Sequence, residues 1–461
     1  MAVTEPSAES DAPESTGPEA PQAARGLATT ARTDVYEVLR VEVLEQLRDL
    51  AVDTQDSDTV RTVVRQVVDA YQARARQGLG VRALASPGQM VVRLDRSLLE
   101  YAPLTPFLDG TIDYEELMIH GSDVTYIDGM GNLQSYDELS TEGEIRSIVA
   151  RLLATIGATV DDARPIIQAQ ILDGQARIGV VIPPISDKIN VTLRRYVVRR
   201  DTFQDLIDWG SVTPAVAGLL TACTRIPTGI IICGQPGAGK TTLANALLDS
   251  APATTRVIAC EDTPELRVAH LNGVSWRTRP AGPDGAGEVL LRDLVKMALG
   301  MRPDIIAVGE TRGGEAYELT RAGNAGCGWM STIHANSGRA AMRALISTAV
   351  MAGNNVPSQE VRSVFSSIVD LVVFLDREPL QLRDDGTAIR RQVMEVLAVP
   401  PMQGSDNDVT VEPLFIREDF GAPLRWTGSP PPPELERRLD KVCRGKGTTL
   451  RQVLDGKADI R

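Results

Sequence analysis

The stretch of the sequence with the clearest chemical meaning is a glycine-rich loop that fits the pattern G-x-x-x-x-G-K-[ST]. It reads Gly234-Gln235-Pro236-Gly237-Ala238-Gly239-Lys240-Thr241-Thr242. The glycines let backbone N–H groups converge on phosphate oxygens without a Cβ in the way. Lys240 is expected to bridge the β- and γ-phosphates of a nucleotide, and the Thr241 hydroxyl to ligate Mg²⁺. An apolar segment precedes the loop, as a phosphate-binding strand–loop–helix unit requires.

Acidic residues after two predicted strands are the second chemical feature. Glu261-Asp262 follows the strand expected at 256–259, and Glu310 follows the strand expected at 304–308. Open α/β sheets place their ligand sites at the carboxyl ends of strands. A phosphate loop also needs acidic groups to hold the water shell of the metal and to polarise the attacking water. Glu310 and Glu261 are therefore candidate catalytic acids, with a helix cap or a solvated loop as the alternative.

His334 ends another predicted strand, at 329–334, where it would lie beside the γ-phosphate. The chain has only three histidines, which argues against a histidine metal cluster. We expect His334 to sense the γ-phosphate, with a purely structural residue as the alternative. His120 and His270 are expected to be structural.

The elements that position these residues alternate in type. From residue 229 onward, strands and helices follow one another, which predicts a mostly parallel sheet with helices on both faces. The expected segments are 229–233, 240–248, 256–259, 289–299, 304–308, 314–325, 329–334 and 339–351, with further edge strands at 371–375 and 392–399.

The same patterns divide the whole chain. The predicted fold class is α/β: a P-loop (RecA-like) NTPase domain with a smaller α+β N-terminal domain and a helical N-terminal extension. The expected parts are a disordered acidic tail at 1–33, a helical region at 34–110, an α+β domain at 111–200, a linker at 201–228, a P-loop ATPase domain at 229–428 and a helical C-terminal tail at 429–461.

Composition excludes several classes of protein. The chain has 461 residues and a formal net charge of −13, with 43% hydrophobic residues, which is typical of several globular domains. Its apolar runs are far shorter than the ~20 residues that span a bilayer, and its N-terminus lacks the apolar core of a signal peptide. Five cysteines without a C-x-x-C pair fit reduced thiols inside a cell. The acidic balance argues against direct nucleic-acid binding.

Longer stretches carry a family resemblance. Residues 285–315, which include Met301-Arg-Pro-Asp-Ile-Ile-Ala-Val-Gly-Glu310, resemble the Walker B region of the type II/type IV secretion-superfamily ATPases. Residues 331–337 resemble the His box of that superfamily, and 258–266 its Asp box. The chain is most similar to the CpaF-like ATPases of tight-adherence (Flp) pilus assembly. The segments that support this branch are 116–128, 175–184 and 191–196.

This resemblance implies roles for single residues. Lys240 and Thr241 would hold phosphate and Mg²⁺, and Glu310 would be the Walker B catalytic acid. Glu261 would belong to the Asp box, and His334 would sense the γ-phosphate of ATP.

Arginines of the N-domain are the other residues that the resemblance singles out. Arg177 and Arg194 match arginines that could neutralise transition-state charge. For Arg194 and its neighbours Arg195, Arg199 and Arg200, a solvated basic face is the alternative. Arg277, Arg279 and Arg312 are further candidates.

The resemblance also implies a biological role. We expect a cytoplasmic homohexamer, bound to the inner face of the membrane through partners, that couples ATP hydrolysis to assembly or secretion of pilin-like subunits at an inner-membrane platform. One alternative is a type IV secretion or conjugation ATPase that exports DNA or effectors. Another is a nucleotide-regulated scaffold ring with little turnover.

Overall fold

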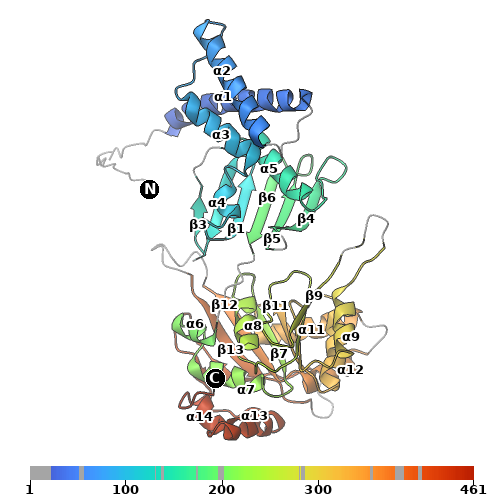
Figure 1. The fold of residues 1–461 in the computed structure, drawn as a ribbon. Helices are drawn as coiled ribbons and strands as arrows, with labels where there is room; N and C mark the ends of the chain where they lie inside the picture. The colour runs from blue at the N-terminus through green and yellow to red at the C-terminus, as the bar shows by residue number, and fades with distance from the viewer. Residues whose placement is uncertain are drawn as a thin grey trace, which may run out of the picture. The chain divides into compact units, whose positions relative to one another are not determined.

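The computed structural model describes residues 22–50, 57–129, 131–136, 140–172, 175–195, 202–279, 281, 286–352, 357–378, 389–402 and 408–460, with the backbone alone at 22–34. These residues form two compact units. The first contains the chain up to residue 195 and the second the chain after it, which also includes the short stretch at 130–132. We describe each unit by itself (Figure 1).

Three helices open the first unit: α1 (Gln22–Asp49), α2 (Ser57–Arg76) and α3 (Pro87–Leu99). They bury one apolar stripe each, with Leu39, Val64 and Leu94 fully enclosed. We expected helices in this region, at 34–110. Helix α1 starts at Gln22, inside the tail that we expected to be disordered, because an alanine-rich segment can extend a docked helix without a new nucleus. The rest of the tail, 1–21, lies outside the described residues.

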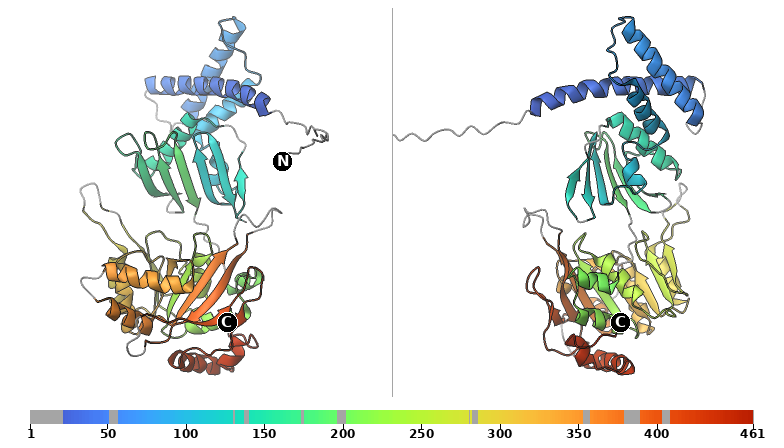
Figure 2. Two further views of the ribbon diagram at one scale, coloured as in Figure 1. Left: turned by 180° about the vertical axis from the view of Figure 1, so that it is seen from behind. Right: turned by 60° about the vertical axis from the view of Figure 1, so that its left-hand side comes forward.

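A six-stranded antiparallel sheet forms the rest of the first unit, in the order β3-β2-β1-β6-β5-β4. One face of this sheet packs on α5 (Glu142–Ala154) and the short α4 (Thr105–Leu108). Figure 2 shows the strands in two further views. Alternation along β5, where Ala176, Ile178 and Val180 are buried, confirms the expected α+β layer. The strands are β1 (Tyr114–His120), β2 (Asp123–Asp128), β3 (Leu133–Ser135), β4 (Ile166–Ile171), β5 (Ala176–Val181) and β6 (Asn190–Arg195).

Polar contacts join the helical region to the sheet domain. The Tyr36 hydroxyl of α1 donates a 2.6 Å hydrogen bond to Oε1 of Glu144 on α5. Beside it, Arg40 donates to the Ser147 hydroxyl over 3.0 Å. These buried contacts explain why the two regions that we expected as separate parts form one unit.

The second unit is built on a nine-stranded sheet in the order β15-β14-β13-β12-β7-β11-β10-β8-β9. The six strands from β12 to β9 are parallel, and β13, β14 and β15 extend one edge in antiparallel pairing. This confirms the expected α/β class. The strands are β7 (Gly229–Gly234), β8 (Val257–Glu261), β9 (Val274–Arg277), β10 (Ile305–Val308), β11 (Gly328–His334), β12 (Leu371–Arg377), β13 (Arg391–Ala398), β14 (Glu412–Ile416) and β15 (Arg425–Trp426).

Helices cover both faces of this sheet. The apolar side chains of β7 alternate between the two layers: Ile230 and Ile232 face one core, Ile231 and Cys233 the other. The first layer contains α6 (Phe203–Asp208), α7 (Pro214–Cys223), α8 (Lys240–Asp249), α13 (Pro433–Gly445) and α14 (Leu450–Leu454). The second contains α9 (Leu291–Leu299), α10 (Glu315–Asn324), α11 (Gly338–Ala352) and α12 (Ser358–Ile368).

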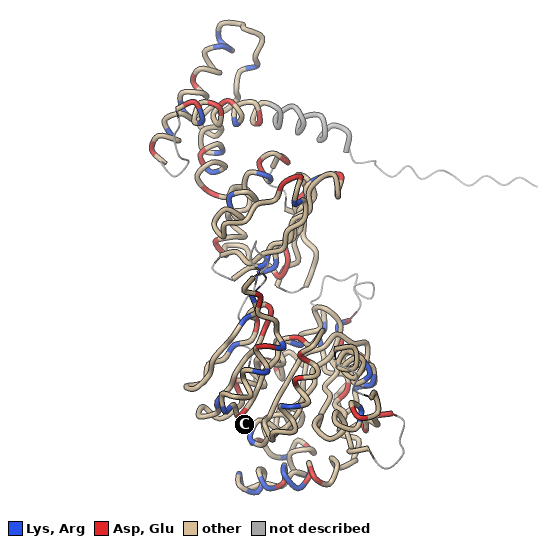
Figure 3. The backbone as a smooth tube through the Cα atoms, turned by 90° about the vertical axis from the view of Figure 1, so that its right-hand side faces the viewer, with Lys and Arg blue, Asp and Glu red and all other residues tan. Residues whose placement is uncertain are grey.

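Two segments that we expected outside the ATPase domain belong to its core. The expected linker at 201–228 contains α7, whose Val216 and Leu219 are fully buried. The expected C-terminal tail at 429–461 contributes Leu439 and Val453 to the same cluster. Both predictions were wrong because α7, which is buried on all sides, and the apolar stripe of α13 need a packing surface, and the sheet face beside α8 supplies it. Exposed positions of α13 carry charges of both signs, for example Glu436 and Lys441. Figure 3 colours the charged residues along the chain.

Among the described residues, no helix combines the length and the apolar character needed to cross a membrane.

Removing a core side chain from α13 tests whether the C-terminal helices belong to the domain. We expect Leu439→Ala to lower the free energy of unfolding by about 2–5 kcal/mol, because it leaves a cavity in a fully buried site. Chemical denaturation followed by circular dichroism measures the change. The exposed Lys441 of the same helix gives the control, and Lys441→Ala should change stability by less than ~0.5 kcal/mol. Equal stability of the two variants would show that α13 is a loose appendage.

Candidate functional site

The glycine-rich loop has the strand–loop–helix geometry that its sequence predicts. The buried strand β7 ends at Gly234, and helix α8 begins at Lys240. Gly237 and Gly239 adopt φ angles of +73° and +93°, which side chains with a Cβ rarely tolerate. The loop therefore turns its backbone onto the N-terminus of α8, where N–H groups without helical partners favour an anion.

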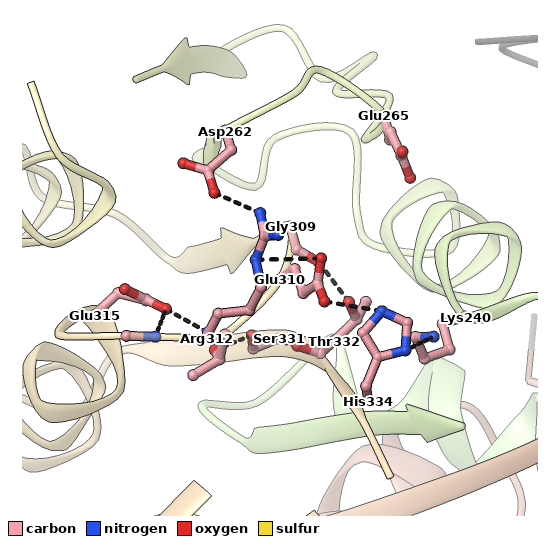
Figure 4. Close-up of polar contacts among 12 residues, drawn as sticks. Lys240, Asp262, Glu265, Gly309, Glu310, Arg312, Glu315, Ser331, Thr332 and His334 are labelled. Atoms are coloured by element: carbon pink, nitrogen blue, oxygen red, sulfur yellow. Dashed lines mark hydrogen bonds and ion pairs between the residues drawn. The ribbon is translucent and has the colours of Figure 1, made fainter. Parts of the chain in front are cut away.

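Lys240 lies in the middle of the site and is only 8% exposed. Its ammonium group donates to the carbonyl oxygens of Gly234 and Gln235, both over 3.0 Å. It also lies 3.2 Å from Nδ1 of His334 (Figure 4). The two carbonyl oxygens and the imidazole nitrogen thus solvate the ammonium group.

His334 and Glu310 continue the chain of contacts from Lys240. The parallel register sets His334 opposite Gly234, so the histidine emerges beside the phosphate loop. Its Nε2 lies 2.9 Å from Oε1 of Glu310. Because lysine can only donate to Nδ1, the contacts assign the ring proton to Nε2, which donates to Glu310. Burial and the nearby Lys240 charge lower the pKa of His334 against the opposite effect of Glu310, which favours this neutral ring.

Arg312 extends the contacts to a second acid. Its Nε lies 3.5 Å from Oε2 of Glu310, and its Nη2 lies 2.8 Å from Oδ2 of Asp262. The two oxygens of Glu310 thus face a histidine on one side and a guanidinium on the other (Figure 4). Arg312 was a second-tier candidate from the sequence, and the structure makes it a neighbour of the predicted catalytic acid.

The loop that carries Glu310 is held by short polar contacts with β11. The Thr332 hydroxyl donates to the carbonyl oxygen of Gly309 over 2.6 Å, and the backbone N–H of Thr311 donates to the carbonyl oxygen of Thr332 over 2.8 Å. On the far side, Oε1 of Glu315 accepts from the backbone N–H groups of Arg312 and Gly313. Glu310 therefore stands on a fixed backbone.

Glu261 is buried behind the site rather than at its surface. The residue is 1% exposed, and its Oε1 accepts from the backbone N–H groups of Glu265 and Leu266 over 2.9 and 2.8 Å. Burial raises the pKa of Glu261 to about 7. Its contacts are with the 262–266 loop, so in this structure it positions that loop.

Glu265 is a site residue that the sequence reasoning missed. Its Oε2 accepts a 3.0 Å hydrogen bond from the Thr241 hydroxyl, the group expected to ligate Mg²⁺. The sequence feature that could have identified Glu265 is its position as a second carboxylate, four residues after Glu261, in the loop that follows the strand. Two adjacent oxygen-bearing side chains, one of them a carboxylate, fit a hard cation that keeps most of its waters. Among the described residues, those of this site included, no group of three His, Cys, Asp or Glu side chains could hold a metal.

The predicted arginines Arg177 and Arg194 lie in the first unit. They face each other across β5 and β6, as direct register partners. Lys240, Glu310 and His334 all belong to the second unit. The role of Arg177 and Arg194 toward phosphate therefore stays a prediction.

Comparisons with known proteins agree on one family. The family model described as "Type II/IV secretion system protein" matches residues 102–383. A Mycobacterium tuberculosis protein named for conjugal transfer is 31% identical over 320 residues, which cover 67% of this chain and 87% of that protein. The type IV secretion system protein VirB11 of Bartonella quintana is 30% identical over 278 residues, 52% of this chain and 76% of that protein.

A solved structure is also similar. The VirB11 ATPase from the Brucella suis type IV secretion system, in complex with sulphate, shows 26% identity, covers 64% of this chain and 93% of that chain, and gives a TM-score of 0.34.

The raised pKa of Glu261 predicts a stability change with pH. The folded state holds a proton on Glu261 that the unfolded chain releases near pH 4.5, so its contribution is fully present below that pH. It is then lost as pH rises toward 7. We expect the free energy of unfolding of the native chain minus that of Glu261→Gln to fall across this window, because ionisation of the buried Glu261 destabilises the native chain and glutamine does not titrate. Denaturant titrations from pH 4 to 8 measure it, and a difference that is constant with pH would contradict the burial effect.

Proposed function

Because the chain belongs to the type II/IV secretion system protein family, we propose that it hydrolyses ATP at the loop 234–242 and couples the hydrolysis to secretion or assembly. The observation that carries the proposal is the contact chain from Lys240 through His334 to Glu310. This chain of contacts joins Lys240, which is suited to binding phosphate, to Glu310, whose carboxylate is suited to activating water.

Phosphate binding follows from the groups at the start of α8. The backbone N–H groups of the loop and the positive end of the helix dipole favour the phosphates of a nucleotide. Lys240 would exchange its bonds to the carbonyls of Gly234 and Gln235 for bonds to phosphate oxygens. These are neutral partners, so a charged phosphate is the better acceptor.

Glu310 is the proposed base that orients and polarises the attacking water. His334 holds one of its oxygens through Nε2, and Arg312 lies near the other, so the carboxylate is fixed in position. A movement of Lys240 toward phosphate would release Nδ1 of His334. His334 is thus suited to report the presence of the γ-phosphate to Glu310.

Thr241 and Glu265 are the proposed holders of Mg²⁺. The Thr241 hydroxyl would ligate the ion directly, and Glu265 would accept from one of its waters. When bound, the ion neutralises phosphate charge during transfer. Glu261 supports this arrangement through its two bonds to the backbone of the Glu265 loop.

Arg177 and Arg194 are the proposed sources of further positive charge, as the sequence resemblance implies. An arginine that reaches the phosphates only during hydrolysis stabilises the transition state rather than the ground state. We propose that hydrolysis takes place in a cytoplasmic homohexamer that reaches the membrane through platform partners.

The substrate of the motor has two candidate classes. Assembly of pilin-like subunits at an inner-membrane platform is the function that the sequence resemblance implies. Export of DNA or effectors is the second candidate, and the relatives named for conjugal transfer and type IV secretion favour it. Affinity capture of membrane partners from the native host separates the two, because a pilus platform and a conjugation channel are different proteins.

Substitutions of Lys240 and Glu310 test the proposed hydrolysis. We expect Lys240→Ala to abolish ATP binding, because it removes the charge that holds the phosphates. Glu310→Gln should bind ATP normally but lower the rate of phosphate release by about 10²–10⁴-fold, as loss of a general base does. Calorimetry and steady-state phosphate release measure the two steps, with Lys441→Ala as a folded control. Turnover at the native rate in either variant would overturn the assignment.

Glu265→Gln tests the proposed Mg²⁺ site. Glutamine keeps the size of the side chain and an oxygen for Thr241, but it loses the negative charge that favours the hydrated ion. We expect a several-fold rise in the Mg²⁺ concentration needed for half-maximal phosphate release. The exposed Glu412→Gln serves as a charge-matched control that should not change it. An unchanged Mg²⁺ requirement in Glu265→Gln would remove Glu265 from the metal site.

A further inference from the structure

The first unit contains a cavity of about 340 Å³ between α3 and the start of α5. This volume lies in the range of small-molecule sites, ~300–1,000 Å³. Its lining combines apolar and charged side chains, notably Val92, Arg93, Arg96, Ala102, Pro103 and Glu144. Every residue that we assign to ATP and Mg²⁺ in the second unit is absent from this lining.

Glu144 gives the cavity a buried polar group with an unused oxygen. The residue is 2% exposed, and its Oε1 accepts the hydrogen bond from Tyr36. Within the described part of the chain, Oε2 has no hydrogen-bond partner. A buried carboxyl oxygen without a partner is costly, so a ligand that bonds to it would gain affinity. Burial raises the pKa of Glu144, against the opposite effect of its contacts with Tyr36, Ser97 and Arg93.

Two arginines on the same side of α3 give the cavity its charge. Arg93 and Arg96 are three residues apart, so they share one face of the helix. The Arg93 guanidinium lies 3.8 Å from the centre of the Tyr36 ring, next to the Glu144 contact, and Arg96 is exposed. The two guanidinium groups give the cavity two positive charges beside the buried carboxyl group of Glu144. Planar guanidinium groups match the oxygens of a phosphate monoester, whose charge is about −2.

The remaining walls fit an apolar, flat group. Val92, Ala102 and Pro103 present aliphatic surface without a competing charge. A free phosphate ion would leave this surface and Glu144 without contacts. A ligand that fills the cavity therefore needs a ring system with polar atoms on one side and a phosphate on the other.

We propose that this cavity is a second ligand site, which binds a nucleoside monophosphate. Its phosphate lies between Arg93 and Arg96, and its base or ribose forms a hydrogen bond with Oε2 of Glu144. This site is additional to the proposed ATP site. Because Glu144 also bonds to Tyr36 of α1, the ligand would rest on the contact that joins the helical region to the sheet domain.

Calorimetry on the full chain tests the proposal, with saturating ADP and Mg²⁺ present to occupy the phosphate loop. We expect AMP or GMP to bind with a Kd below about 1 mM. Inorganic phosphate and adenosine should each bind at least about tenfold more weakly, because each makes only part of the contacts. Absence of binding by both nucleotides would overturn the proposal. Binding of inorganic phosphate as tight as that of the nucleotides would also overturn the proposal, because it would indicate a site for anions only.

Three variants locate the binding. Arg96→Gln should weaken AMP or GMP binding by about tenfold or more through loss of a charged hydrogen bond, whereas Arg82→Gln, an exposed arginine outside the cavity, should not. Lys240→Ala should leave AMP or GMP binding unchanged. Loss of AMP or GMP binding in this variant would place the nucleotide at the phosphate loop instead. The Lys240→Ala measurement therefore tests the second ligand site separately from the proposed ATPase activity. Glu144→Leu, checked for folding by circular dichroism, should also weaken binding.

Discussion

A buried lysine at the start of helix α8 is the constraint on which the candidate site depends. Lys240 is 8% exposed, and a buried charge needs hydrogen-bond partners both with and without a bound ligand. The structure meets this need with two loop carbonyls and one imidazole nitrogen. These contacts hold the ammonium group beside the phosphate loop. The remaining polar contacts of the site follow from this arrangement.

The sheet brings the other groups to Lys240. Strands β7, β11, β10 and β8 are adjacent and parallel, so their carboxyl ends form one edge. His334 lies at the end of β11 beside Gly234, and Glu310 follows the end of β10. The contact between Gly309 and Glu261 shows how tight this edge is: a Cβ on Gly309 would lie 2.9 Å from Cγ of Glu261. A larger residue before Glu310 would therefore displace either the loop that carries Glu310 or the buried acid behind it.

Much of this arrangement could be predicted from the sequence because it depends on local patterns. The loop 234–242 and the alternation of strands and helices identify the fold class and the edge that holds the ligand. Glu265 was missed because its contact with Thr241 depends on how the loop after β8 folds back, which no local pattern reveals. Glu261 was expected to face the ligand, and only the fold shows it bonded to backbone N–H groups. Helices α7 and α13 were placed outside the domain because amphipathic patterns show that a face is buried but not which surface buries it.

The coupling between His334 and Glu310 is the central claim, and a double-mutant cycle on single-turnover phosphate release tests it most directly. Rates are compared for the native chain, His334→Gln, Glu310→Gln and the double variant, at saturating ATP and Mg²⁺. If His334 acts through Glu310, the double variant should be no slower than Glu310→Gln alone. If the two substitutions multiply their effects, the residues act independently, and the contact chain from Lys240 to Glu310 has no catalytic role.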